Sequence, residues 1–188
     1  MFIIKKILNL NSIVFIFILP ITIFISINEF INIKELREVN NKINNDALVT
    51  NDKYEELSLY SSAYLLGKQG EYENAIEKYN VLLRLYPSTN NIDVIYFNIG
   101  TVYLRDGLSK PLSDDGKLTI ENFQKLQSAI ISFEKALALN PLNDLAKFNL
   151  SILYSSMPKE PSKIISEQAV QELSNIPIGL PWKQNSLT

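Results

Sequence analysis

Hydrophobic and polar positions divide the chain into one unbroken apolar block and a longer region of periodic helices. Residues 7–27 read ILNLNSIVFIFILPITIFISI and contain no charged side chain. A helix of this length spans about 31 Å, close to the hydrocarbon thickness of a bilayer. Lys5 and Lys6 precede the block and mixed charges follow it, so the positive-inside rule keeps the N-terminus in the cytoplasm. We predict a cytoplasmic stub over 1–6, a transmembrane anchor over 7–27 and export of the remainder.

A cleaved signal peptide is the alternative reading of the same block. Against it, residues 25–31 read ISINEFI and lack a small-x-small cleavage site, and the chain has no cysteine for lipid attachment. A buried core helix is the third reading. Residues 28–50 carry apolar side chains at helical spacing, and we predict a juxtamembrane stalk helix there.

Beyond residue 50, apolar residues recur every three or four positions, which predicts amphipathic helices joined by turns. Segment 63–87, AYLLGKQGEYENAIEKYNVLLRLYP, predicts the end of one helix, a turn and a second helix that a proline ends. Segment 96–103, YFNIGTVY, begins a second copy, and 148–154, FNLSILY, begins a third. One apolar face running through 119–139 predicts a long helix. The chain is therefore expected to be all-α.

These hairpins resemble the tetratricopeptide repeat (TPR), a helix-turn-helix unit of about 34 residues that stacks into a solenoid. The resemblance implies about two and a half repeats over 51–156. The second copy is interrupted by an insertion at about 105–118, where Gly107 and Pro111 indicate a loop. A generic bundle of hairpins with coincidental spacing is the alternative. The positions that match the repeat are Gly70 (at a tight contact between helices), Tyr72, Ala75, Tyr79, Pro87, Tyr96, Gly100, Tyr103, Ala129, Phe133, Ala136 and Pro141.

The last part of the chain, 157–188, is expected to hold a capping helix and an apolar tail. A helix at about 162–174 would cover the open end, because each repeat leaves an apolar face for its neighbour. Residues 175–182 read NIPIGLPW and are too rich in proline and glycine for a helix or a central strand. Trp182, the only tryptophan, is a candidate anchor. The tail either folds into the chain's own groove, which we favour, or docks into a partner.

The amino-acid composition limits the reactions and ligands that the chain could support. The chain has no histidine and no cysteine, which removes the usual nucleophilic triads and the common ligands of zinc, haem and iron–sulfur clusters. Asp106, Asp114 and Asp115 do not have the spacing of a calcium loop. The net charge of −2 argues against nucleic-acid binding. We therefore predict no catalytic residue, no cofactor, no metal, no small-molecule substrate and no enzymatic activity.

A binding groove is the remaining candidate site. TPR proteins bind partners mostly on the concave surface formed by the first helix of each repeat. The residues that match this surface are Tyr60, Tyr64, Phe97, Asn98, Thr101, Phe148, Asn149 and Ile152. Tyrosines replace the lysine and asparagine of the carboxylate clamp at 60 and 64, so an apolar extended or helical segment is favoured over an acidic C-terminus. The alternative is that these rings pack against the chain's own loop or tail.

A narrower resemblance comes from the whole arrangement: an anchor, an interrupted second repeat, ALALNPLNDLAKFNLSILY over 136–154, and IPIGLPW at the end. It is similar to the small MxaK-type TPR proteins of bacterial methanol-oxidation clusters, which accompany MoxR-type AAA+ ATPases and von Willebrand factor A (VWA) domain membrane proteins. The resemblance implies an inner-membrane protein with a periplasmic TPR domain. It would act with VWA-domain proteins to mature a periplasmic enzyme such as methanol dehydrogenase. A structural subunit of a cell-envelope or secretion assembly is the alternative.

Overall fold

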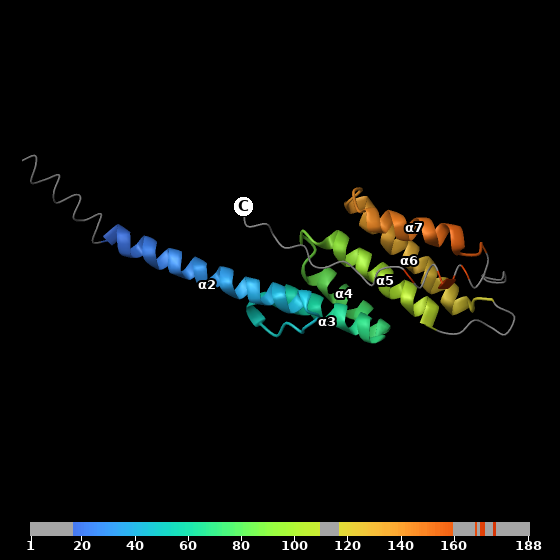
Figure 1. The fold of residues 1–188 in the computed structure, drawn as a ribbon, viewed down its shortest axis with the longest axis horizontal. Helices are drawn as coiled ribbons and strands as arrows, with labels where there is room; N and C mark the ends of the chain where they lie inside the picture. Colours follow the sequence, from blue (N-terminus) through green and yellow to red (C-terminus); the bar gives the residue numbers. More distant parts are fainter. Residues whose placement is uncertain (1–16, 110–116, 160–167, 169, 172–174, 176–188) are drawn as a thin grey trace, which may run out of the picture. The chain divides into compact units, whose positions relative to one another are not determined.

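The computed structural model describes residues 17–109, 117–159, 168, 170, 171 and 175. This part consists of the α-helices α2 to α7 and one 3-10 turn, with no strand (Figure 1). The prediction of an all-α chain is therefore confirmed. The chain divides into two compact units, Met1–Asn41 and Lys42–Thr188.

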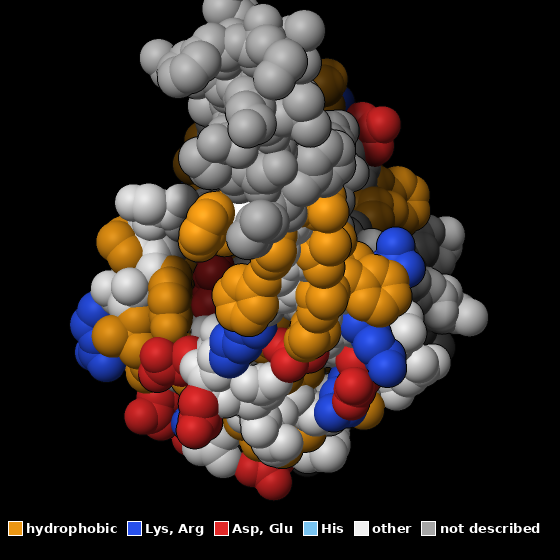
Figure 2. Space-filling view, turned by 90° about the vertical axis from the view of Figure 1, so that its left-hand side faces the viewer, with side chains coloured by type: hydrophobic (Ala, Val, Ile, Leu, Met, Phe, Trp, Pro, Cys, Tyr) orange, Lys and Arg blue, Asp and Glu red, His pale blue; other side chains and the backbone are white. Residues whose placement is uncertain are grey.

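Helix α2 (Leu19–Asn44) joins the end of the predicted anchor and the start of the predicted stalk in one uninterrupted helix. Hydrophobic side chains gather around its N-terminal part (Figure 2). Those more than two-fifths exposed are Leu19, Ile21, Ile23, Phe24, Ile25, Ile27, Phe30 and Ile31. Over the described residues, no helix is both long enough and apolar enough to cross a membrane. Residues 7–16 of the predicted anchor lie outside the described ranges.

The predicted stalk helix over 28–50 is too long, because α2 ends at Asn44. Asp46 has a left-handed backbone, with φ of 54°. The N–H of Ala47 donates to the carbonyl of Lys42 at 2.7 Å, and the N–H of Asp46 donates to that of Ile43 at 3.1 Å. These two bonds form a Schellman motif, which stops a helix and reverses the chain. Aspartate tolerates this conformation better than most non-glycine residues.

The first hairpin consists of the 3-10 turn η2 (Asp52–Tyr54), α3 (Glu55–Gln69) and α4 (Tyr72–Leu85). Gly70 ends α3 with a φ of 84°, a conformation that favours glycine. A Cβ there would come no closer than 4.0 Å to another atom, so backbone conformation rather than tight packing requires this glycine. Its predicted place in a tight contact between helices is wrong. The turn, the start of α4 at Tyr72 and its end before Pro87 agree with the prediction.

The second hairpin consists of α5 (Ile92–Ser109) and α6 (Ile120–Leu139), and α7 (Asp144–Ser156) follows it. The helix predicted over 119–139 is confirmed. Its cap is the Thr119 hydroxyl, which accepts from the N–H of Asn122 at 3.1 Å. The Asn143 side chain caps α7 in the same way, on the N–H of Ala146 at 3.0 Å. Each helix from α3 to α7 packs on the next one along the chain, and α5 on α6 most extensively.

The start of the predicted insertion is wrong. Residues 105–109 belong to α5, and Gly107 lies buried inside the helix instead of marking a loop. The reason is tertiary: a Cβ on Gly107 would lie 3.0 Å from a methyl carbon of Leu126 and 3.1 Å from the carbonyl oxygen of Asn122, so the glycine lets α6 approach. Residues 110–116, including Pro111, Asp114 and Asp115, lie outside the described ranges.

The core of the second unit runs through both hairpins. On the side of α3 and α4 it contains Tyr60, Ala63, Ala75, Tyr79 and Leu82. A second cluster joins α5, α6 and α7: Phe97, Leu104, Leu118, Phe123, Leu126, Ala129, Phe133, Ala136, Ala146, Leu150 and Leu153. Val170 packs against this second cluster and is helical, as are 168 and 171. The other residues of the capping helix predicted at 162–174 lie outside the description.

Candidate functional site

Helix α5 presents two opposite sides, and each is a candidate surface. Asn98 points toward α3, because its amide reaches Tyr60, and Gly100 points toward α6, because Phe133 packs there. Successive helical residues turn by about 100°, so Thr101 lies between these two directions and nearly opposite Tyr103. We call the side of α5 that carries Val94 and Thr101 the inner face. The opposite side, which carries Tyr103, belongs to an open groove described below.

The inner face corresponds to the predicted partner groove, and the structure differs from that prediction at most positions. Five of the predicted groove residues are buried, with exposures of 2% or less: Tyr60, Phe97, Asn98, Thr101 and Asn149. Three are accessible: Tyr64 on α3 and Ile152 on α7 are half-buried, and Phe148 on α7 is 53% exposed. The structure therefore does not form one open aromatic surface from these eight residues. Trp182 lies outside the described residues.

Tyr60 and Asn98 are buried because they hold three helices together. The Asn98 amide donates to the Tyr60 hydroxyl at 2.9 Å and also bonds the Tyr79 hydroxyl on α4. The Tyr60 and Tyr79 rings meet edge to face, 6.1 Å apart, and Tyr64 stacks on Tyr60 at 6.2 Å. Burial raises the pKa of both Tyr60 and Tyr79, a shift that the hydrogen bonds to Asn98 only partly offset. These tyrosines are structural and stay protonated.

The burial of Asn149 is not explained by any hydrogen bond of its side chain. Its side chain is fully buried on α7, and neither its amide nitrogen nor its amide oxygen has a hydrogen-bond partner in the described part of the chain. A buried amide without partners costs about 1–3 kcal/mol. Asn122 on α6 is in the same state.

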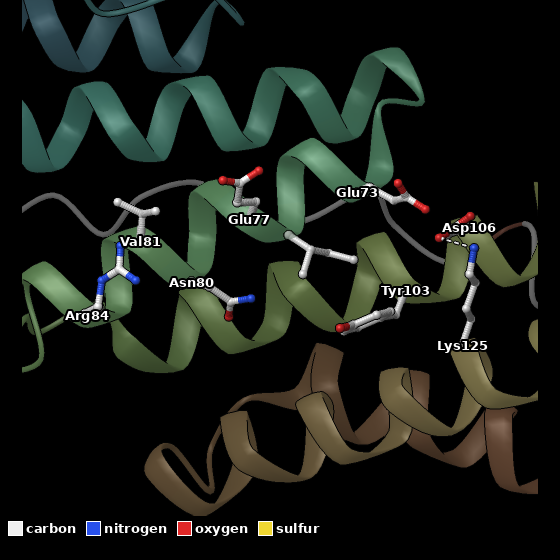
Figure 3. Close-up of a pocket in the computed structure, with 9 residues that line it drawn as sticks. Glu73, Glu77, Asn80, Val81, Arg84, Tyr103, Asp106 and Lys125 are labelled. Atoms are coloured by element: carbon white, nitrogen blue, oxygen red, sulfur yellow. Dashed lines mark ion pairs between the residues drawn. The ribbon is translucent and has the colours of Figure 1, made fainter.

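The opposite side of α5 holds a groove of about 470 Å³ between α4 and α6 (Figure 3). Polar residues of α4 spaced one helical turn apart form one wall: Glu73, Glu77, Asn80 and Arg84. Tyr103 and Asp106 of α5 form the floor, and Lys125 of α6 closes one end. We call this the outer groove.

The outer groove holds a paired charge rather than a reactive one. Lys125 lies 2.7 Å from the Asp106 carboxylate and 3.0 Å from that of Glu121. Burial lowers the pKa of Lys125, but the hydrogen bonds to Asp106 and Glu121 outweigh this effect and raise its pKa above the ordinary value. The amine is therefore protonated near neutral pH and unsuited to act as a base or nucleophile. Within the described ranges no three acidic side chains come together to hold a metal ion.

Sequence reasoning missed the outer groove. A signal was present, because Glu73, Glu77, Asn80 and Arg84 form a polar stripe of helical period. It also missed Leu145, one turn before Phe148, which extends the exposed apolar stripe of α7 and is 37% exposed. Comparison with models of protein families, with curated proteins and with solved structures gave no match to this chain.

Proposed function

We propose that the chain is a protein-interaction scaffold of the TPR type. The observation that carries this proposal is the serial packing of α3 to α7, with residues of little or no side chain at the closest contacts. Gly67 of α3 lies against Val102 of α5, and Gly100 of α5 lies against the Phe133 ring. Ala75 and Ala129, which match the small position of the second repeat helix, are both fully buried. Small residues at such contacts are what stacked helical repeats require.

The proposed location is the inner membrane of a bacterium, with a single pass, the N-terminus in the cytoplasm and the repeats in the periplasm. Ile23, Phe24 and Ile25 are consecutive and all at least half exposed, so apolar side chains cover most of the circumference of α2 near its N-terminus. A helix with so wide an apolar surface is stable when lipid or protein surrounds it. We expect the chain to stay with membranes in alkaline carbonate. Release of the intact chain would contradict the anchor.

The proposed role is that of an accessory factor that holds a periplasmic enzyme such as methanol dehydrogenase during maturation, together with VWA-domain membrane proteins. Support comes from the resemblance to MxaK-type proteins and from the accessible apolar stripe on α7. This stripe consists of Leu145, Phe148 and Ile152, spaced three and four residues apart. Such a surface suits an apolar segment of another protein. Attachment to the membrane would raise the local concentration of membrane-bound partners, so a modest intrinsic affinity suffices.

Site-specific photo-crosslinking in intact cells tests this role. A photoreactive phenylalanine analogue at Phe148 is expected to form adducts with a VWA-domain protein or a periplasmic enzyme, identified by mass spectrometry. Ile131 on α6 is the matched control, since it is 52% exposed against 53% for Phe148 and lies outside the stripe. No adduct at Phe148, or the same adducts at both positions, would contradict the proposal. Adducts with secretion or envelope components would favour the structural-subunit alternative.

A further inference from the structure

The outer groove carries charged side chains that no neighbouring side chain neutralises. Glu73, Glu77 and Arg84 of α4 line it, and all three are exposed. Within the described part of the chain, none of the three forms a hydrogen bond or an ion pair. Lys125 differs from them, because two carboxylates offset its charge. The α4 wall of the groove therefore offers charges that a ligand can pair.

These charges have opposite signs at the two ends of the α4 wall. Figure 3 shows Arg84 at one end and Glu73 at the other, with Asn80 and Glu77 between them. A polyamine or a lysine-rich segment would be repelled by Arg84, and an acidic segment would be repelled by the glutamates. The wall therefore fits a ligand that carries a positive group and a negative group, one for each end.

The groove is long and open, which favours part of a protein over a small molecule. A second hollow, of about 450 Å³, continues it and shares Glu73, Asp106 and Lys125 with it. The α4 side chains on the wall are exposed, so a small molecule would keep much of its surface in water. Small-molecule sites usually enclose most of their ligand. A segment that continues into a larger protein has no such requirement.

The middle of the groove favours an extended segment over a helix. Asn80 is exposed, and its amide has no hydrogen-bond partner in the described ranges. A side-chain amide can both donate to and accept from a peptide backbone. An extended backbone has such groups to offer, whereas those of a helix bond to one another. Ile76, Val81 and Tyr103 are half-buried and supply apolar surface beside Asn80.

We propose that the outer groove binds an extended segment of another protein. A lysine or arginine of this segment would pair with Glu73 and Glu77, and an aspartate or glutamate would pair with Arg84. The midpoint of the two glutamates lies about 13 Å from Arg84 along α4, which about four extended residues span. Side chains four positions apart in a strand point to the same side. The ligand is thus defined by a basic and an acidic residue about four positions apart, in either order, which we call the charge pair.

This inference goes beyond the proposed function, because it concerns a different surface. The apolar stripe of α7 consists of Leu145, Phe148 and Ile152, and none of these residues lines the outer groove. The chain would then have one apolar binding surface and one charged binding surface. Either can be present without the other, so the two proposals are tested separately.

Selection from a displayed library of random short peptides tests the ligand. The full chain in lipid nanodiscs is the bait, and empty nanodiscs first remove the peptides that bind lipid. We expect peptides with the charge pair to be enriched over their frequency in the unselected library. Enrichment of basic peptides without an acidic residue, or no enrichment of the charge pair, would overturn the proposal.

A charge reversal at one end of the groove tests the site. Arg84→Glu is expected to replace the acidic position of the enriched peptides with a basic one. Lys78→Glu is the matched control, since Lys78 is also an exposed cation of α4 but does not line the groove. Circular dichroism checks that both variants fold. An unchanged preference in Arg84→Glu, or the same switch in Lys78→Glu, would contradict the assignment.

A synthetic peptide with the charge pair then measures affinity for the full chain by calorimetry. Glu77→Gln is expected to weaken binding about two- to five-fold, the range for an exposed ion pair. Added salt should weaken it further, because exposed charges are screened. Phe148→Asp should leave the affinity unchanged, which separates this site from the stripe on α7. Binding that ignores both Glu77→Gln and salt, or that is lost in Phe148→Asp, would place the peptide elsewhere and overturn the proposal.

Discussion

At the scale of single residues, the contact between α5 and α6 depends on the absence of a side chain at Gly100. A Cβ there would lie 2.8 Å from two carbons of the Phe133 ring. The ring cannot move away easily, since Phe133 is fully buried and meets Phe97 at 5.3 Å. Two opposing effects of an added methyl group can therefore be compared at this site.

Gly100→Ala is expected to destabilise the chain by up to about 2 kcal/mol. Alanine gains about 1 kcal/mol of helix propensity over glycine, whereas overpacking a rigid core costs about 1–3 kcal/mol. The unfolding free energy from urea titration measures the net effect. Gly67→Ala is the control: it has the same propensity gain, and its Cβ would have a single close neighbour, a methyl carbon of Val102 at 3.0 Å, with the Cβ of Ala75 at an ordinary 3.8 Å. A Gly67→Ala change as damaging as Gly100→Ala would argue against the clash.

Residue identity alone identified several residues that share one face of a helix, but it assigned some buried residues to a binding surface. The repeat pattern places Tyr60, Asn98 and Thr101 on one face. Their match to the concave surface of TPR proteins predicts a partner groove there. Whether such a ring meets a partner or its own chain depends on tertiary neighbours such as Tyr79, which lie far away in the sequence.

At the scale of elements, one buried ion pair joins α5 and α6. The Asp106 side chain is 9% exposed, and its carboxylate lies 2.7 Å from the ammonium of Lys125, whose side chain is 18% exposed. Removing one member of a buried pair leaves the other charge buried without a partner, which is costly. Removing both members leaves no unpaired charge behind.

Lys125→Met is expected to destabilise the chain by about 1–3 kcal/mol, less than for a fully buried pair because the outer groove admits water. The double variant Asp106→Asn with Lys125→Met should recover most of this loss in the same urea titration. Lys147 and Asp144 on α7 provide the control, since their side chains are 50% and 89% exposed. Lys147→Met should change stability by less than about 0.5 kcal/mol. Equal losses from Lys125→Met and Lys147→Met would refute the argument.

The elements themselves were largely predictable, because local signals set them. Thr119 before an apolar face predicted the start of α6, and Pro87 predicted the end of α4. The boundaries that failed depend on longer-range packing or on unusual capping. Gly107 has the identity of a loop residue but sits in α5, where Leu126 needs the space. Asp46 stops α2 through a left-handed turn that few residues other than glycine and asparagine adopt.

At the scale of the whole molecule, the second unit holds its first three helices together through the polar contacts of Tyr60, Asn98 and Tyr79. The predicted partner groove included Tyr60, whereas Tyr79 was expected to be structural, and the burial of both gives the fold a dependence on alkaline pH. Their pKa values in the folded chain lie above the ordinary value of 10.0. In the unfolded chain they ionise near that ordinary value.

Stability should therefore be fully present below about pH 10 and should fall as pH rises above it, because the unfolded chain then releases protons that the folded chain retains. Each buried tyrosine lowers the free energy of unfolding by about 1.4 kcal/mol for each pH unit in this range. Tyr60→Phe is expected to be less stable than the unchanged chain by about 1 kcal/mol at pH near 8, through loss of the bond from Asn98. The two chains should converge between about pH 10 and 12, since the variant loses one of these two slopes. Urea titrations followed by circular dichroism across this range measure the difference, and parallel curves would show that Tyr60 ionises as readily in the folded chain as in the unfolded one.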